Sequence, residues 1–217
     1  MPNSNLRTGE PRWPAMIAVL GIGGLYLVLP NSLTVGPNWG LPAVLIVLEM
    51  GVVASHRGGS RRTNEMLAYS ILSLLTLALI TSLFLLVGAL LAHKGTPKEM
   101  LAAAAALWVT NVMVFASWYW RLDAGGPNQR DLLNEHLDGA FLFPQMVMDA
   151  ETKETMGEVG WRPGFIDYLF LAFNSSAAFS PTDSPVLSRW AKLVMMIQSS
   201  ISLTTIAVIA ARAINIL

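Results

Sequence analysis

Few side chains of this sequence could do chemistry, and the most notable ones stand inside apolar segments. Glu49 is the clearest case, because an ionisable group inside a membrane-spanning segment costs at least ~2.5 kcal/mol and usually faces water or a partner. Asn111 and Gln198 stand in two other apolar segments, at comparable depth if the segments alternate across a bilayer. The three residues predict either an ion or proton site or a hydrogen-bonded clasp between helices, and membrane helices commonly use such groups as a clasp.

A second set of polar side chains recurs along the last apolar segment. Gln198, Ser202, Thr205 and Arg212 are separated by four, three and seven residues, so they share one stripe of a helix. In a channel this stripe would line the inner pore, and helix packing is the alternative. Arg212 would either reach the interface or ring an inner mouth, where it would disfavour cations.

Several function classes find no support in the sequence. The 14 basic and 14 acidic residues balance, so no basic surplus indicates nucleic-acid binding. The chain has no cysteine, and its three histidines lack metal-ligand spacing. No nucleophile–histidine–carboxylate set or phosphate-binding motif indicates an enzyme, a metal site or a cofactor.

The composition predicts an all-α integral membrane protein. Of the 217 residues 53% are hydrophobic and only 13% are charged, and the mean hydropathy is +0.51. A spanning helix needs roughly 17 to 25 mostly apolar residues. Five segments are predicted to span the bilayer: Trp13–Leu29, Gly40–Ser55, Met66–Ala92, Met100–Trp120 and Ser188–Ile216.

The chain divides into two predicted parts. Residues 1–98 form a three-helix membrane region, and residues 99–217 contain an outer helix, an acidic loop at 121–162 and an inner helix at 188–216. Between the loop and the inner helix, residues 165–179 are apolar but too short to span, which favours a re-entrant helix. Because irregular backbone at membrane depth is tolerated beside a watery cavity, re-entrance indicates a pore. If residues 161–180 span instead, the chain has six spans.

The segment FIDYLFLAFNSSAAFSPTDSPVLSRW, residues 165–190, resembles the pore module of tetrameric potassium-type cation channels. With Asp167-Tyr168-Leu169-Phe170 on the acidic and aromatic start of the family's pore helix, Asp183 coincides with the Asp that ends its filter. Pro185 and Arg189 lie near a proline and a basic residue that often follow. The resemblance implies a homotetramer and passage of monovalent ions.

The filter itself departs from the family pattern. Phe179, Ser180, Pro181 and Thr182 stand where the family has Val-Gly-Tyr-Gly, so the glycines that turn successive carbonyls toward the ion are missing. We therefore expect no potassium-selective cage; Phe179 is either a hydrophobic constriction or part of a structural plug. The C-terminal half also resembles uncharacterised bacterial membrane proteins related to two-helix ion channels, which implies the bacterial inner membrane.

Three functions remain open from the sequence. The first is an ion-channel-like oligomer, the second a non-conducting scaffold or sensor whose acidic loop binds a partner, and the third a small proton-linked transporter using Glu49. The membrane orientation expected from the basic residues conflicts with the channel function. Short basic loops normally face the cytoplasm, which would place the acidic loop inside, whereas a potassium-type pore needs it outside. The basic residues concerned are Arg7, Arg12, Arg57, Arg61 and Arg62.

Overall fold

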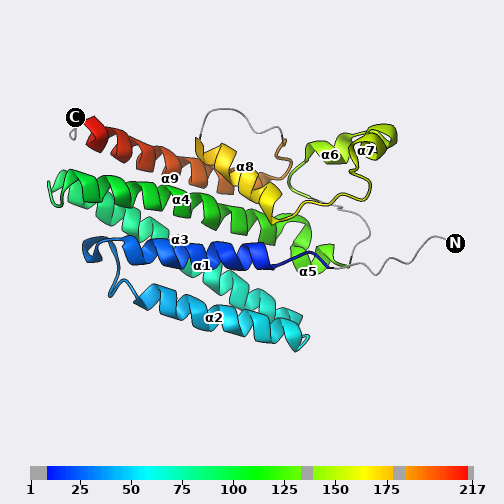
Figure 1. The fold of residues 1–217 in the computed structure, drawn as a ribbon, viewed down its shortest axis with the longest axis horizontal. Coiled ribbons are helices and arrows are strands. Elements are labelled where there is room, and N and C mark those ends of the chain that lie inside the picture. The colour runs from blue at the N-terminus through cyan, green and yellow to red at the C-terminus, as the bar shows by residue number, and fades with distance from the viewer. Residues whose placement is uncertain (1–8, 133–138, 178–183, 215–217) are drawn as a thin grey trace.

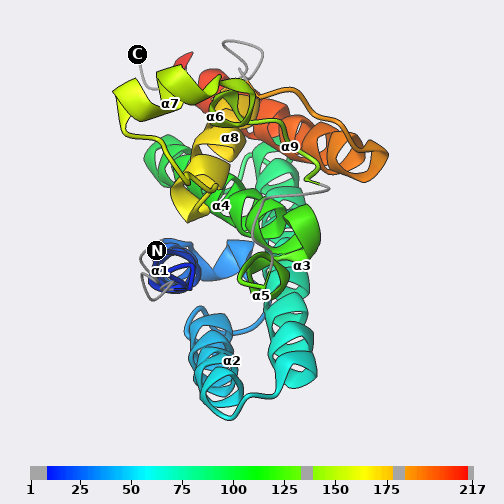
Figure 2. The same cartoon turned by 90° about the vertical axis from the view of Figure 1, so that its right-hand side faces the viewer.

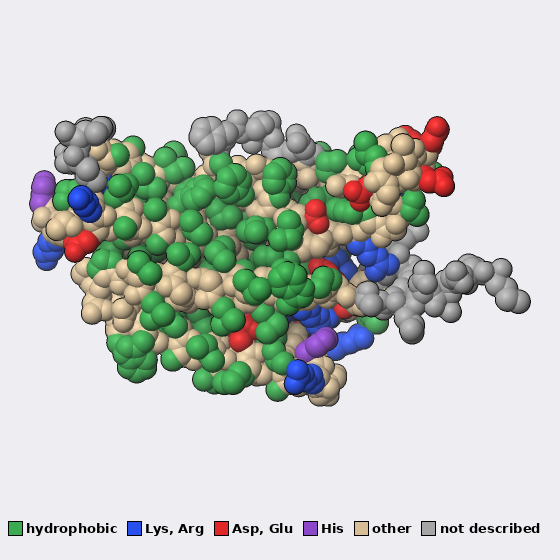
Figure 3. All heavy atoms as spheres, in the orientation of Figure 1, with side chains coloured by type: hydrophobic (Ala, Val, Ile, Leu, Met, Phe, Trp, Pro, Cys, Tyr) green, Lys and Arg blue, Asp and Glu red, His purple; other side chains and the backbone are tan. Residues whose placement is uncertain are grey.

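A computed structural model describes residues 9–132, 139–177 and 184–214, and these residues form a bundle of long helices (Figure 1). Four helices are long and apolar enough to cross a membrane: α2 (Gly40–Arg57), α3 (Arg61–Leu91), α4 (Pro97–Leu122) and α9 (Arg189–Ile214). A shorter apolar helix, α1 (Trp13–Val28), packs beside them. Charged side chains gather toward the two ends of the bundle, and its flank is mostly hydrophobic (Figure 3). The predicted all-helical architecture is confirmed for the described residues, and four of the helices have the length and apolar composition of membrane spans.

The helix bounds follow local sequence signals. Helix α4 begins after Thr96, whose hydroxyl accepts a hydrogen bond from the Glu99 N–H while the Glu99 carboxylate accepts one from the Thr96 N–H. Helix α3 begins at Arg61, five residues before the predicted Met66. The basic stretch predicted as a loop is therefore mostly helical, and the turn between α2 and α3 is confined to residues 58–60.

Helix α4 is the central element, and Figure 2 shows it between two groups of helices. Helices α1 and α3 pack on one side, with α2 beyond them, and α8 (Phe165–Ala177) and α9 pack on the other. Small residues allow this close approach, since Ala103, Ala104 and Ala116 of α4 are almost completely buried. The predicted outer helix therefore also forms the core of the N-terminal helices.

The chain turns sharply where α4 ends. Gly125 and Gly126 both have positive φ, and a Cβ on Gly126 would lie 2.5 Å from the Arg121 carbonyl oxygen, so only glycine fits there. The turn contains a 3₁₀ helix at Asp123–Gly125 and leads into the short helix α5 (Pro127–Arg130). Two further short helices follow, α6 (Pro144–Val147) and α7 (Ala150–Met156).

Helix α8 runs from the end of α4 toward the middle of the bundle. Near its start, the Tyr168 hydroxyl donates to Asp123 Oδ2 at 2.6 Å, just beyond the last turn of α4. Near its end, Ser176 lies beside Asn111 in the middle of α4. The described chain resumes after α8 at the same end of the bundle as the start of α8, because the Leu187 N–H donates to the Ala140 carbonyl at 2.8 Å. Ala140 in turn donates to Asp123 Oδ1.

Candidate functional site

A buried polar clasp, formed by Asn111, Tyr119, Ser176 and Gln198, joins α4, α8 and α9. The Gln198 side chain is its centre: Nε2 donates to the Ala172 carbonyl at 2.7 Å and to Ser176 Oγ at 2.8 Å. Its Oε1 accepts a hydrogen bond from the Tyr119 hydroxyl. Gln198 is fully buried, so the amide replaces water contacts with three protein contacts. This side chain fixes the distance between α8 and α9.

Asn111 completes the clasp from α4. Its Nδ2 lies 3.2 Å from the Gln198 carbonyl oxygen and 3.3 Å from Ser176 Oγ, and it donates to both. Asn111 Oδ1 is buried without a hydrogen-bond partner in the described chain. The arrangement matches the clasp predicted from Asn111 and Gln198 and adds Ser176 and Tyr119, which sequence reasoning missed. Two serines near the end of a short apolar helix, Ser175 and Ser176, were the available signal.

The polar stripe of α9 faces the interior of the protomer. Gln198, Ser202 and Thr205 have no exposed area. Ser202 Oγ donates to the Ser176 carbonyl at 2.5 Å and accepts from Trp108 Nε1 at 2.9 Å, while Thr205 Oγ1 donates to the Ile201 carbonyl of its own helix. These are the contacts of the helix-packing alternative.

Arg212 is the exception in the stripe. Its side chain is only 8% exposed, and Nε and Nη2 have no hydrogen-bond partner within the described ranges.

The predicted filter-like segment lies outside the described residues; it comprises Phe179, Ser180, Pro181, Thr182 and Asp183. The last two residues of the predicted 165–179 helix also lie outside them.

Glu49 does not join the clasp. It lines a pocket enclosed by α1, α2, α3 and α4, together with Asn64 of α3 and Arg121 of α4. The contact predicted among Glu49, Asn111 and Gln198 is therefore wrong for Glu49. Equal depth did not bring the three together, because α2 packs on α1 and α3 and is separated from α8 and α9 by α4.

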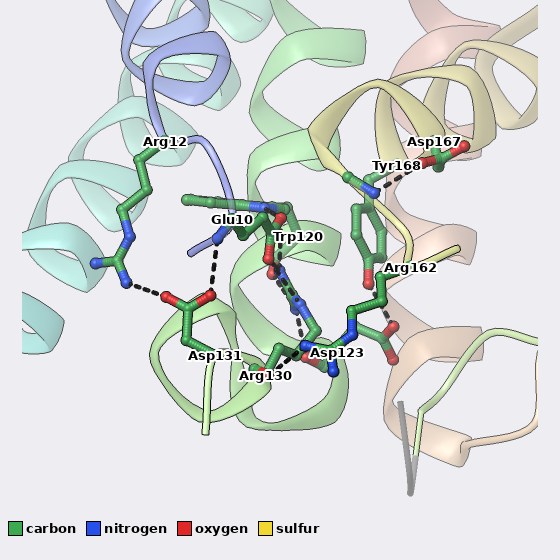
Figure 4. A network of polar contacts seen from close by, with 10 residues as sticks. Glu10, Arg12, Trp120, Asp123, Arg130, Asp131, Arg162, Asp167 and Tyr168 are labelled. Carbon is green, nitrogen blue, oxygen red and sulfur yellow. Dashed lines mark hydrogen bonds and ion pairs between the residues drawn. The ribbon is translucent and has the colours of Figure 1, made fainter. Parts of the chain in front are cut away.

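A second polar network closes the end of α4 (Figure 4). Arg130 Nη2 lies 2.9 Å from Glu10 Oε2 in a largely buried ion pair, and Arg130 Nη1 donates to the carbonyls of Trp120 and Asp123 at 2.9 and 2.7 Å. Trp120 Nε1 also donates to Glu10, and the Arg130 guanidinium lies over the Tyr168 ring at 5.4 Å. The start of α1, the end of α4 and the start of α8 are thereby held together.

The same network pairs the basic and acidic segments of the sequence. Arg12 Nη2 lies 2.9 Å from Asp131 Oδ2, the Glu10 N–H donates to Asp131 Oδ1, and Arg12 Nη1 lies 3.0 Å from His56 Nδ1. The basic and acidic loops therefore occupy the same end of the bundle. The predicted solvated loop at 121–162 is wrong for its first part, because Asp123 and Arg130 are buried.

The described residues contain no group of three or more His, Asp or Glu side chains arranged to hold a metal ion. Comparison of the chain with protein-family models, with curated proteins and with solved structures gives no match.

Proposed function

We propose that the protein is an ion-channel-like, multi-pass protein of the bacterial inner membrane. In this proposal α4 is the outer helix, α8 a re-entrant pore-type helix and α9 the inner helix of a homotetramer that passes monovalent ions. Residues 179–183 form its non-potassium-selective constriction. Helix α1 is a fifth span, so five spans and one re-entrant helix put the two termini on opposite sides of the membrane; the start of α1 and the end of α9 lie at opposite ends of the bundle in Figure 1.

The observation that supports the proposal most is the path of α8. Its 13 residues extend about 20 Å at 1.5 Å per residue, which is short of a hydrocarbon core about 30 Å thick. It starts beside Asp123 and ends beside Asn111, and the chain is back at the level of Ala140 by Leu187. A segment that enters and leaves at the same end of a bundle is the geometry of a pore helix and its filter loop.

The clasp supplies the second support. Backbone that leaves a helix inside a membrane needs partners within the protein or beside water. Asn111 and Gln198 hold the last turn of α8, and Ser202 caps the Ser176 carbonyl. The clasp therefore fixes the level at which α8 ends.

The exposed faces of α8 and α9 suit assembly around an axis. Both helices expose large apolar side chains, and in a tetrameric pore module such exposed faces meet neighbouring subunits. The side chains are Ile166, Phe170 and Phe173 of α8 and Leu193, Met196 and Ile197 of α9.

Re-entrance can be tested by cysteine labelling, since the chain has no native cysteine. Val159, Leu187 and Val35 are exposed positions before α8, after α8 and in the loop between α1 and α2. Single cysteines at Val159 and Leu187 should react with a membrane-impermeant maleimide from the same side of the membrane, and a cysteine at Val35 from the opposite side. Labelling of Val159 and Leu187 from opposite sides would show that α8 belongs to a span and overturn the proposal.

Conduction is tested with purified protein in liposomes, by K⁺ and Na⁺ flux alongside the mass of the oligomer. We expect a tetramer whose flux increases at least several-fold in Phe179→Ala, because a bulky constriction is removed. The control is Met50→Ala, which truncates an exposed apolar side chain of α2 outside the pore module. No flux in either variant from a folded monomer or dimer would exclude the channel.

A further inference from the structure

The Glu49 pocket has an apolar part that adjoins a polar part. The apolar part has a volume of about 180 Å³ and is lined by residues of α1, α2, α3 and α4. A more polar pocket of about 200 Å³ lies against it and shares Arg12, His56 and Asn64 with it. The apolar wall includes Met16, Val19, Val53, Ala68, Ile71 and Leu72. This combination suits a molecule that carries both an apolar part and a polar group.

Two buried acceptors in this pocket lack donors within the described part of the chain. Glu49 is 8% exposed and Asn64 is 2% exposed. Within the described residues, Glu49 Oε2 and Asn64 Oδ1 have no hydrogen-bond partner. The Asn64 nitrogen is already committed, since it donates to the Val52 carbonyl at 2.9 Å and to Ser55 Oγ at 3.3 Å. Buried polar groups are nearly always paired, so both oxygens call for a donor that the described chain does not supply.

A cation also lines the pocket, and within the described residues its guanidinium makes no hydrogen bond or ion pair. Arg121 is 6% exposed, and its guanidinium lies over the Trp120 ring at 5.4 Å. Arg121 and Glu49 line the same pocket, yet neither of the ion pairs found in the described chain joins them. The pocket therefore presents a separated carboxylate and guanidinium, which together match a ligand carrying both charges.

We propose that this pocket binds an amphipathic phosphoethanolamine group. Its primary ammonium donates to Glu49 and Asn64, and its phosphate accepts from Arg121. An ammonium has three N–H donors, enough for both acceptors, and a guanidinium binds phosphate through paired N–H groups. The site goes beyond ion conduction, because it lies among α1–α4, on the other side of α4 from α8 and α9. Phosphatidylethanolamine and soluble phosphoethanolamine share this chemistry.

The test uses the full-length protein in phosphatidylcholine nanodiscs, with binding measured by the shift in thermal unfolding midpoint. Four probes are titrated: short-chain phosphatidylethanolamine, short-chain phosphatidylcholine, short-chain phosphatidylglycerol and soluble phosphoethanolamine. Phosphatidylcholine keeps the phosphate but has no N–H, and phosphatidylglycerol keeps the phosphate but has no ammonium. We expect phosphatidylethanolamine to bind at least tenfold more tightly than either.

Three variants locate the site. Glu49→Gln should weaken phosphatidylethanolamine binding at least tenfold, and the exposed control Glu151→Gln in α7 should leave it unchanged. Val53→Phe fills the pocket without touching a polar group and should also weaken binding, which keeps the proposal testable if Glu49→Gln fails to fold. Equal binding of phosphatidylethanolamine and soluble phosphoethanolamine would identify a free solute as the source.

Three results would overturn the site: equal binding of all three lipids, binding unaffected by Glu49→Gln and Val53→Phe, or no binding of either ethanolamine probe. None of these results bears on flux through the α4–α8–α9 module, so the two proposals fail separately.

Discussion

Buried polar side chains on the two sides of α4 differ in how completely they are hydrogen-bonded. On the α8–α9 side, Gln198 uses both ends of its amide in hydrogen bonds to neighbouring helices. On the α1–α3 side, Glu49 and Asn64 each keep a buried oxygen without a partner in the described chain. Both sets stand in apolar helices, and the sequence alone does not distinguish them. Asn111 on the α8–α9 side also keeps an unpartnered Oδ1 in the described chain, so the contrast lies between Gln198, whose amide is paired at both ends, and Glu49, whose Oε2 is not.

The difference shows that partners determine the role of a membrane-buried polar residue. A paired amide stabilises helix packing, with each hydrogen bond contributing about 0.6 kcal/mol on average in membranes. A buried carboxylate oxygen without a donor costs free energy and is retained where it serves a ligand or an ion. Opposite effects of mutation on stability are therefore expected on the two sides.

The largest expected effect on stability comes from a substitution at the end of α4, where the Arg130 network joins helices from both sides. In Arg130→Met the Glu10 carboxylate is left without its cation and the Trp120 and Asp123 carbonyls lose a donor. Breaking a largely buried ion pair costs about 3–5 kcal/mol. Reversible unfolding in mixed micelles should show this loss, whereas Gln129→Ala, an exposed neighbour in α5, should stay within about 0.5 kcal/mol.

The clasp alone is broken by Gln198→Leu. The substitution keeps the size of the side chain but removes three hydrogen bonds, so we expect the free energy of unfolding to fall by about 2 kcal/mol. Amide hydrogen exchange should increase in the last turn of α8, where Ser176 loses a donor, and not in α2. Unchanged exchange in α8 would mean that the clasp does not position this helix.

The pocket side should respond with the opposite sign. Glu49→Leu removes a buried carboxyl with an unpartnered oxygen, and we expect the free energy of unfolding to rise by ~1 kcal/mol in lipid without ethanolamine headgroups. The same micelle assay measures it. A loss of stability comparable to that of Gln198→Leu would erase the proposed contrast between the two sides.

A smaller effect is expected at the edge of the clasp. Ser202→Ala leaves Trp108 Nε1 and the Ser176 carbonyl without their shared partner. Two membrane-buried hydrogen bonds of average strength predict a loss of about 1 kcal/mol. Tryptophan emission should report the changed Trp108 environment, and the control is Ser200→Ala, whose exposed hydroxyl donates only to the Met196 carbonyl of its own helix.

The smallest effect is expected far from both sides, at α7. The Thr152 N–H donates to Asp149 Oδ1 at 2.8 Å, and this hydrogen bond lowers the pKa of Asp149 below its ordinary value of 3.8. A lowered pKa in the folded state means that the cap contributes above pH 3.8 and is lost as the pH falls through the folded-state pKa. Amide exchange in α7 should rise in acid and in Asp149→Ala, whereas Asp149→Asn should keep the cap at all pH values.

Helix positions were largely predictable because membrane helices are encoded by long apolar runs. Helix α1 was expected at Trp13–Leu29 and ends one residue earlier. Helix α3 begins five residues earlier than predicted, since its first turn is polar and carries no apolar signal. The ion pairs of Arg130 and Arg12 could not be predicted, because they join residues about 120 positions apart in the sequence.

The sequence by itself determined the all-helical class, the long apolar helices, the short length of α8 and the identity of the buried polar residues. Each follows from local composition, which sets how much apolar surface a segment offers. Only the tertiary structure decided which polar residues meet. Helix α4 lies between α2 and α9, so it brings Asn111 to Gln198 and keeps Glu49 on its other side. Helix order around a central helix is a packing outcome, set by the side chains of all the helices together.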